Sequence, residues 1–308
     1  GSLSGSSNFV FDGTNVGIGT TSPYAKLSVQ ASLDQTSDIF AIASSSQQNF
    51  LSMNYFGGIT QKIAADPVED GSVSTGSEAY DVYVTGRYAY VASGNSGLEI
   101  FDVASSTSPY KLGEIDTVAA TKAVHVSGKY AYVVSDSTGD DLEIFDVSDP
   151  TNPIKVGGVD AAASATNVYV SGKYAYVTSL ATDDDLEIFD VSDPTNPFKV
   201  GGIGAENHTR GLYVSGTYAY VGSQTGGGDE FEIFDISDPA NPIKLGGADT
   251  SDHILGIYVS GNYAYVSVSG NAGDELEIFN ISDSSNPVKI GGADAGTGNG
   301  DPLDIYVS

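Results

Sequence analysis

Acidic residues gather at one recurring place in this sequence and could bind a metal ion. Hard cations such as Ca²⁺ take several oxygen ligands, and neighbouring carboxylates can supply two or three of them. The clusters therefore predict a calcium-binding rim, although none has the spaced aspartates and central glycine of an EF-hand loop. We favour a simpler interpretation, in which they are solvated hairpin tips that discourage aggregation. The residues are Asp140, Asp141, Asp183, Asp184, Asp185, Asp229, Glu230, Asp274 and Glu275.

Histidine and basic residues form a second candidate group. His208 and His253 each lie eight residues before the glycine of a recurring hairpin. Imidazole together with carboxylates could hold a transition metal, but two histidines in variable loops can also arise by chance. Lys122 and Arg210 are the rare bases in the same connections, and variable loops on a constant scaffold are where ligands are usually recognised. These four residues are the predicted ligand-binding set, whereas His125 replaces a strand tyrosine and is expected to be packed inside a blade.

A third pattern places a lysine nine residues after an aspartate in four copies. A hairpin turning between them would put the two charges opposite one another, and such cross-strand pairs contribute up to about 1 kcal/mol. We therefore interpret them as structural. The chain has no nucleophile elbow, P-loop, zinc-binding helix or kinase signature, so we predict that it is not an enzyme. The pairs are Asp102/Lys111, Asp146/Lys155, Asp190/Lys199 and Asp235/Lys244.

The elements that position these residues come from an internal repeat. The hairpin Val-Ser-Gly-Lys-Tyr-Ala-Tyr-Val or a variant recurs around five glycines, at successive spacings of 42, 44, 44 and 45 residues. Leu-Glu-Ile-Phe-Asp or a variant follows, and then Ser-Asp-Pro-Thr-Asn-Pro and Ile-Lys-Val-Gly-Gly or their relatives. Four short strands per unit, joined by Gly, Pro and Asx turn residues, are typical of a β-propeller blade. The glycines are Gly86, Gly128, Gly172, Gly216 and Gly261.

Each unit is expected to contribute strands A to D in order. In the third copy these are residues 167–170, 173–178, 186–191 and 198–202. Both faces of the strands are largely apolar, as they must be when sheets stack face to face. The prediction is an all-β protein with a β-propeller of four-stranded antiparallel blades. A stacked β-solenoid is the alternative, but its repeats are usually shorter.

The wording of the repeat, VYVSGKYAYV followed by LEIFDVSDPTNPIKVGG, resembles LVIVD-repeat proteins over residues 79–308. The resemblance implies a propeller in exported or surface-associated bacterial and archaeal proteins, and it implies no defined reaction. Residues 304–308 restart the unit as a sixth strand A, which favours six blades. The rest of that blade could follow residue 308, come from upstream strands of the chain, or come from another subunit. The expected repeats are residues 79–117, 118–160, 161–204, 205–249 and 250–294, with a partial one at 295–308.

Residues 1–64 lack the repeat and are expected to form a small β module. Within it, residues 15–30 (NVGIGTTSPYAKLSVQ) resemble a segment of phage tail-fibre-like and bacterial surface-fibre proteins. This resemblance implies assembly into a fibre or stalk. The polar stretch 65–78 is expected to be a linker into the propeller.

Composition limits the partners and the compartment. With 40 acidic and 12 basic residues, the net charge of −28 disfavours duplex nucleic acid and anionic membrane surfaces. No apolar run is long enough for membrane insertion, and the absence of cysteine excludes disulfides. We predict an extracellular or cell-surface structural protein that self-associates into a filament, fibre or array, or binds another surface component, with Ca²⁺ as the one candidate cofactor. The alternatives are an adhesin using its D-to-A loops and a metal-dependent propeller hydrolase or lyase.

Overall fold

The computed structural model describes residues 69–307, apart from 137–138, 162–163, 181–184, 206–207, 225–227, 270–273 and 295–303, together with six short strands nearer the N-terminus. The chain divides into two compact units, Gly1–Glu69 and Asp70–Ser308. This boundary falls inside the stretch 65–78 that the sequence predicts to be a linker. Asp183 and Asp184, two of the predicted calcium ligands, lie outside the described residues.

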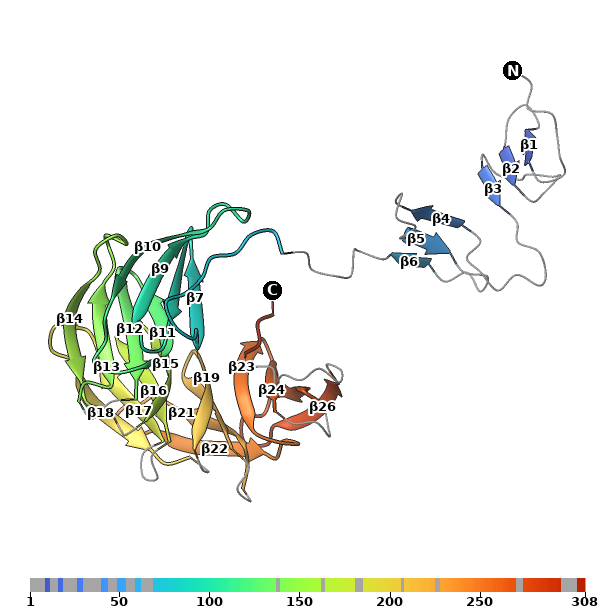
Figure 1. Cartoon of the computed structure of the whole chain (residues 1–308). Helices are drawn as coiled ribbons and strands as arrows, with labels where there is room; N and C mark the ends of the chain where they lie inside the picture. The colour runs from blue at the N-terminus through green and yellow to red at the C-terminus, as the bar shows by residue number, and fades with distance from the viewer. Residues whose placement is uncertain are drawn as a thin grey trace. The chain divides into compact units, whose positions relative to one another are not determined.

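The N-terminal unit contains two three-stranded sheets (Figure 1). In the first sheet, β2 pairs antiparallel with β1 and parallel with β3. In the second, β4, β5 and β6 pair antiparallel in that order. The strands are β1 (Phe9–Phe11), β2 (Val16–Ile18), β3 (Leu27–Val29), β4 (Phe40–Ala43), β5 (Asn49–Met53) and β6 (Ile59–Gln61).

The C-terminal unit consists of five four-stranded antiparallel sheets, one for each repeat, and its described residues include no helix. Within each sheet the strands pair in chain order, A to D, as the repeat predicts. The sheets are β7 (Asp81–Thr85), β8 (Tyr88–Ala92), β9 (Leu98–Asp102) and β10 (Tyr110–Ile115); β11 (Thr121–Ser127), β12 (Tyr130–Ser135), β13 (Leu142–Asp146) and β14 (Ile154–Val159); β15 (Ala165–Ser171), β16 (Tyr174–Ser179), β17 (Leu186–Asp190) and β18 (Phe198–Ile203); β19 (Thr209–Ser215), β20 (Tyr218–Ser223), β21 (Phe231–Asp235) and β22 (Ile243–Ala248); and β23 (Ile254–Ser260), β24 (Tyr263–Val268), β25 (Leu276–Asn280) and β26 (Val288–Ala293).

Local turn chemistry explains why the strands recur at constant spacing. The A–B turn of each sheet carries a glycine in the left-handed region, such as Gly172 with φ +60°, where a side chain would be strained. The C–D turn is held by an aspartate that bonds forward along the chain. In the second sheet, Asp149 Oδ1 accepts hydrogen bonds from the Thr151 backbone N–H at 3.0 Å and from its hydroxyl at 2.7 Å. Such Asx turns reverse the chain within a few residues.

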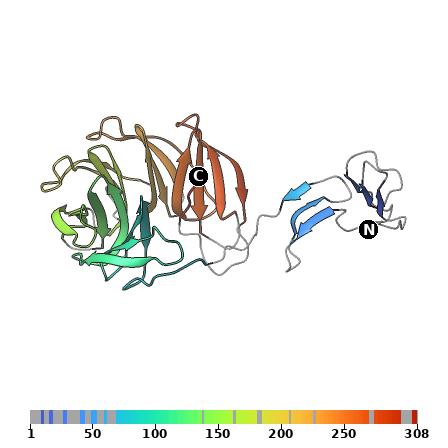
Figure 2. The same cartoon turned by 90° about the horizontal axis from the view of Figure 1, so that it is seen from above.

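Consecutive sheets stack face to face and follow one another around an arc (Figures 1 and 2). Their first strands are neighbours along the inner side of the arc. Between the first two sheets, Tyr90, Leu98 and Ile100 pack against Val124 and Phe145, and all five are almost completely buried. Burial of both faces of each interior sheet is what the apolar pattern predicts.

The predicted alignment of Asp102 with Lys111 is wrong, because the strands pair in a different register. Tyr110 lies opposite Asp102, and Lys111 lies opposite Phe101. Since alternate residues of a strand point to opposite faces, Lys111 shares its face with Phe101 and Glu99 rather than with Asp102. The same register recurs in the next three sheets, where the strand-D lysine lies opposite Phe145, Phe189 and Phe234.

Candidate functional site

A lysine in each D strand forms an ion pair with the glutamate of the neighbouring C strand. The Nζ to carboxylate distance is 2.6 Å for Lys111–Glu99 and 2.8 Å for Lys155–Glu143. Equivalent pairs occur in the other three sheets, and all five glutamates are buried. A buried carboxylate is stable only with a cation and hydrogen bonds around it. These recurring ion pairs therefore join strands C and D within each sheet.

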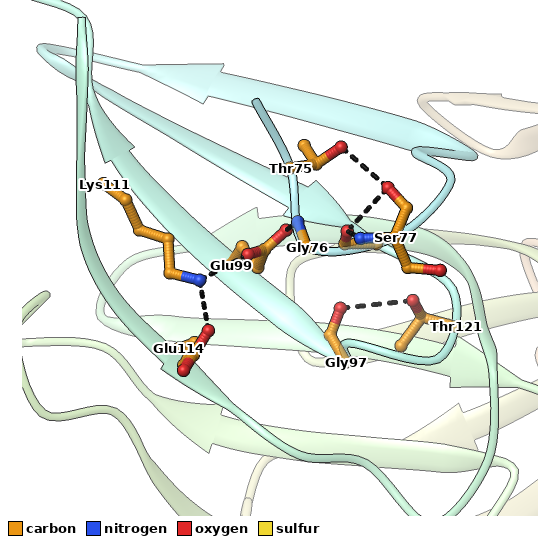
Figure 3. A network of polar contacts seen from close by, with 9 residues as sticks. Thr75, Gly76, Ser77, Gly97, Glu99, Lys111, Glu114 and Thr121 are labelled. Carbon is orange, nitrogen blue, oxygen red and sulfur yellow. Dashed lines mark hydrogen bonds and ion pairs between the residues drawn. The ribbon is translucent and has the colours of Figure 1, made fainter. Parts of the chain in front are cut away.

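Glu99 shows how such a carboxylate is satisfied (Figure 3). It accepts from Lys111 and from the backbone N–H of Gly76 at 2.9 Å, and Lys111 also pairs with Glu114. Burial by itself raises the pKa of Glu99, but the hydrogen bonds from Lys111, Ser93 and Gly76 outweigh it and lower the pKa below its usual value. The group is thus held as an anion inside the sheet.

The strand-C aspartate has a different partner from the one predicted. It pairs with the base that follows the A–B glycine: Arg87 with Asp102, Lys129 with Asp146 at 2.6 Å, and Lys173 with Asp190 at 2.9 Å. Hydrogen bonds from Lys129 and Ser148 lower the pKa of Asp146 to about 2. These ion pairs lie beside the A–B turn rather than across the C–D hairpin.

The first acid of each described B–C cluster contacts the lysine of its own D strand. Asp140 lies 2.9 Å from Lys155, and the equivalent pairs Asp229–Lys244 and Asp274–Lys289 measure 3.2 and 3.3 Å. Each lysine thus bridges two carboxylates, one in the loop and one in strand C. The structure therefore gives these loop acids a role in positioning the hairpin.

The last acid of the cluster points into the fold in three of the sheets. Asp141, Asp185 and Glu230 are buried. The Asp185 carboxylate accepts from the Ala205 backbone N–H at 2.9 Å, and the Glu230 carboxylate accepts from that of Thr250 at 3.0 Å. Glu275 is half-buried. Among the described residues, no three His, Cys, Asp or Glu side chains gather into a group that could hold a metal ion.

The four residues of the predicted ligand-binding set lie at the starts of three A strands. Lys122 and Arg210 belong to β11 and β19 rather than to the loops in which they were expected. The Lys122 ammonium lies 4.4 Å from the ring centroid of Tyr80, a cation–π contact. His208 precedes β19 with φ +43°, and His253 precedes β23 with its Nδ1 3.6 Å from the Asp252 carboxylate.

A column of aromatic rings along the inner strands was missed by the sequence analysis. The centre of each A strand carries a ring, and these five rings form a row with the ring of Tyr306, with neighbouring centroids 4.6 to 5.4 Å apart. Its signal in the sequence was the strand-A tyrosine that recurs with the repeat. His125 is a packed member, as predicted: burial lowers its pKa to about 4, and its Nδ1 has no hydrogen-bond partner. The column is Tyr83, His125, Tyr169, Tyr213, Tyr258 and Tyr306.

The two end sheets expose apolar side chains that interior sheets bury. Val82 and Val84 in β7 are 55% and 59% exposed, whereas their counterparts Val124 and Val126 in β11 are 3% and 5% exposed. On the far face of the fifth sheet, Ile290 is 55% exposed and Tyr265 is half-buried. The C-terminal end of the chain lies between β7 and β23 (Figure 1). We call these two faces the end walls. On the first of them Val82 and Val84 are open, whereas Ala89, Val91 and Phe101 of strands B and C are buried.

Comparison with known protein families identifies the repeat. The sequence profile of the LVIVD repeat matches residues 76–117, 120–161, 162–203, 207–250 and 255–294. This chain belongs to the LVIVD repeat family. The five matches coincide with the five LVIVD sheets of the structure, and the expectation drawn from the repeat wording is confirmed. The profile does not cover residues 15–30, and the comparisons give no support to the fibre-like resemblance of that segment.

Solved structures that resemble this LVIVD chain show its fold. A functionally unknown protein from Desulfotomaculum acetoxidans aligns with a TM-score of 0.60 and 15% identity over 71% of each chain. A protein from Lactobacillus plantarum aligns with a TM-score of 0.62 and 14% identity over 83% of this chain and 81% of the other. The periplasmic gluconolactonase of Pseudomonas aeruginosa aligns with a TM-score of 0.63 and 14% identity, over 88% and 83%. At such identities the likeness establishes a propeller-like fold alone.

No curated protein matches this LVIVD chain. In the part of the chain that the structure describes, no helix has the length and apolar character needed to cross a membrane.

Proposed function

We propose that this LVIVD-repeat chain is a non-enzymatic structural protein of the cell surface or extracellular space, whose propeller joins it to other chains in a filament, fibre or array. The exposed end walls are the observation that supports this most. Val82 and Val84 are open on β7, although the same positions are buried in every following sheet. Two neighbouring exposed valines on one face of a strand support a contact with another polypeptide.

The pairing of charges supports a non-enzymatic role. The strand-C glutamates and loop acids that a hydrolase would need contact lysines of the same sheets, as Lys155 does with Asp140 and Glu143. Catalytic acids and bases must instead face a cleft and reach a substrate. The lactonase activity of one similar structure belongs to that protein, because 14% identity supports only the fold.

Composition and family support the surface location. The repeat wording resembles that of exported and surface-associated proteins, and a net charge of −28 keeps an exposed β-rich protein soluble. Absence of cysteine fits a chain that needs no particular redox compartment. The repeat wording and the charge therefore support an extracellular setting.

Sedimentation velocity over a wide range of protein concentrations tests this function. The expected result is a mass that increases with concentration above that of the monomer. Replacing both Val82 and Val84 with lysine should abolish the increase, because charges placed on the wall oppose its burial. The matched control replaces Ile154 and Phe198 with lysine. These two side chains are 55% and 52% exposed on interior sheets, so the control should leave assembly unchanged. Monomers at every concentration, with or without Ca²⁺, would rule out self-assembly.

A further inference from the structure

A second row of side chains runs along the inner strands beside the aromatic column, and we call it the rim row. Each member stands three residues before a ring of the column, at the point where an A strand begins. Members of neighbouring sheets touch, since the Lys122 ammonium lies 4.4 Å from the ring centroid of Tyr80. From the first to the fifth sheet the rim row is Tyr80, Lys122, Thr166, Arg210 and Leu255.

The two cations of the rim row differ from the other bases of the propeller. Every other lysine and arginine of the C-terminal unit forms an ion pair with a carboxylate of its own sheet, as Lys111 does with Glu99. Within the described residues, neither Lys122 nor Arg210 has such a partner. In a chain with a net charge of −28, two cations without a carboxylate on the same row need an explanation.

Acids close to the rim row in the fold bind other donors. The Asp81 carboxylate accepts from a backbone N–H of β11 at 2.8 Å. Glu78 accepts from the Tyr80 hydroxyl at 3.1 Å, and Asp136 accepts from the Ser164 hydroxyl at 2.9 Å. The described acids around the row are therefore engaged elsewhere, and the two cations remain available to an anion from outside the chain.

Uncharged groups hold both cations in position. The Tyr80 ring supports the Lys122 ammonium through the cation–π contact, which leaves its N–H donors free for an anion. With its amide oxygen toward the guanidinium, Gln224 accepts from Arg210 Nε at 3.2 Å and from Nη2 at 3.3 Å. The Asn167 amide donates to the Arg210 backbone oxygen at 3.1 Å. Side chains positioned in this way lose less entropy when a ligand binds.

The separation of the two cations sets the shape of the anion. In the second, third and fourth sheets the rings of the aromatic column have successive centroid distances of 4.7 and 5.4 Å. Lys122 and Arg210 stand before the first and the last of these rings, so two such steps separate them, and a single carboxylate is too small to bridge them. Between them lies Thr166, whose hydroxyl donates to the Thr209 backbone oxygen at 2.7 Å. The middle of the row therefore carries no charge.

We propose that Lys122 and Arg210 bind the two ends of an elongated dicarboxylate, whose uncharged middle crosses the third sheet at Thr166. The proposal goes beyond the proposed function, because it assigns a small-molecule ligand to the propeller. A guanidinium binds a carboxylate through two parallel N–H groups, and an ammonium attracts the second carboxylate as a point charge. A ligand with only two charges suits this chain, because its net charge of −28 repels a long polyanion.

The test follows the NMR spectrum of the ¹⁵N-labelled full-length chain during titration with azelate, a long straight-chain dicarboxylate, at constant ionic strength and at a protein concentration that gives monomers. We expect saturable shifts of the backbone amides of both Lys122 and Arg210 and of the Arg210 Nε–H. Malonate, a short dicarboxylate, and hexanoate, which has one carboxylate, each reach a single cation. Both should therefore bind about fivefold more weakly than azelate.

Three variants with the same change in net charge separate this site from general electrostatics. Lys122→Gln and Arg210→Gln should each weaken azelate binding about fivefold, because each removes one of the two contacts. The matched control is Lys129→Gln, which removes a lysine that pairs with Asp146 beside the turn at the other end of β11. It should leave the affinity for azelate unchanged.

Four results would overturn the proposal. The first is the absence of saturable shifts, and the second is an equal loss of affinity in all three variants, which would mean general electrostatics. The third is equal affinity for azelate and malonate, which would mean two separate anion sites. The fourth is inorganic phosphate binding as tightly as azelate, which would mean a site without preference for dicarboxylates. Because the titration uses the monomer, none of these outcomes depends on the proposed self-assembly.

Discussion

At the scale of single residues, two groups on the inner strands titrate in overlapping ranges with opposite effects on stability. Burial, reinforced by Asp304, raises the pKa of Asp81 from 3.8 to about 6. The contribution of Asp81 to the free energy of unfolding is therefore full below pH 3.8 and is lost as pH rises through 6. Burial lowers the pKa of His125 from 6.5 to about 4. The contribution of His125 to the free energy of unfolding is full above pH 6.5 and is lost as pH falls through 4.

Single substitutions should uncover the two contributions. With His125→Tyr, which installs the tyrosine of the other copies, the free energy of unfolding should rise as pH falls from 6.5 to 4.5. With Asp81→Asn it should fall over the same range, by at most about 3 kcal/mol. Asn167 already occupies the equivalent place, so the amide is compatible with the fold. Urea unfolding at several pH values measures both slopes, and parallel curves for wild type and both variants would refute the assignment.

The residue scale also shows where sequence reasoning failed. The constant nine-residue offset between Asp102 and Lys111 showed that the charges recur, but it did not reveal the face on which each lies. That face depends on strand register, and a one-residue change in register moves a side chain to the other side of the sheet. The pairing of Lys111 with Glu99 could therefore be learned only from the structure.

At the scale of elements, contacts between neighbouring sheets explain why certain residues recur in every copy of the repeat. The Ile-Lys-Val-Gly-Gly segment was recognised as a D strand, and β18 extends the expected 198–202 by one residue. The reason for its first glycine is non-local, because Gly157 approaches the backbone of Pro194 in the following sheet. No pattern within a single copy contains that information.

A matched pair of substitutions tests this contact. Gly157→Ala places a methyl group 2.1 Å from the Pro194 carbonyl oxygen and 3.2 Å from the Thr195 Cα, so the sheets must separate, and we expect a loss of about 2 kcal/mol. Gly291→Ala is the control: it occupies the same place in β26, where nothing lies within 4 Å, and should change stability by less than about 1 kcal/mol. Equal losses in urea unfolding would show that the neighbouring sheet is not the cause.

At the scale of the whole molecule, the high negative charge should produce a general response to cations rather than a calcium-specific one. Five of the described B–C loop acids contact lysines or backbone N–H groups: Asp140, Asp185, Asp229, Glu230 and Asp274. We therefore expect Ca²⁺ and Mg²⁺ at equal ionic strength to raise Tm by the same amount through screening. Calorimetry after chelation measures this. A larger shift with Ca²⁺ would instead support the calcium rim predicted from the acidic clusters.

The five complete sheets could be predicted from the sequence because every copy repeats the same turns and apolar alternation. Residues 304–308 restart the unit in the sequence and were expected to be a sixth strand A; the structure places the Tyr306 ring beside Tyr258 but assigns no strand to residues 304–307. Residues 70–76 were assigned to a linker because they lack the Lys-Val-Gly-Gly wording of a D strand. The structure shows that they pack on the first sheet, with Gly71 against Ser106 and the Gly76 N–H donating to Glu99.

Sedimentation velocity of the full-length chain, compared with the variant that carries lysine in place of both Val82 and Val84, tests the proposed self-assembly most directly. We expect the mass of the wild-type protein to rise with concentration and the variant to stay monomeric, because charges on the first end wall oppose its burial. Monomers of the wild-type protein at every concentration, or equal assembly of the two proteins, would contradict it.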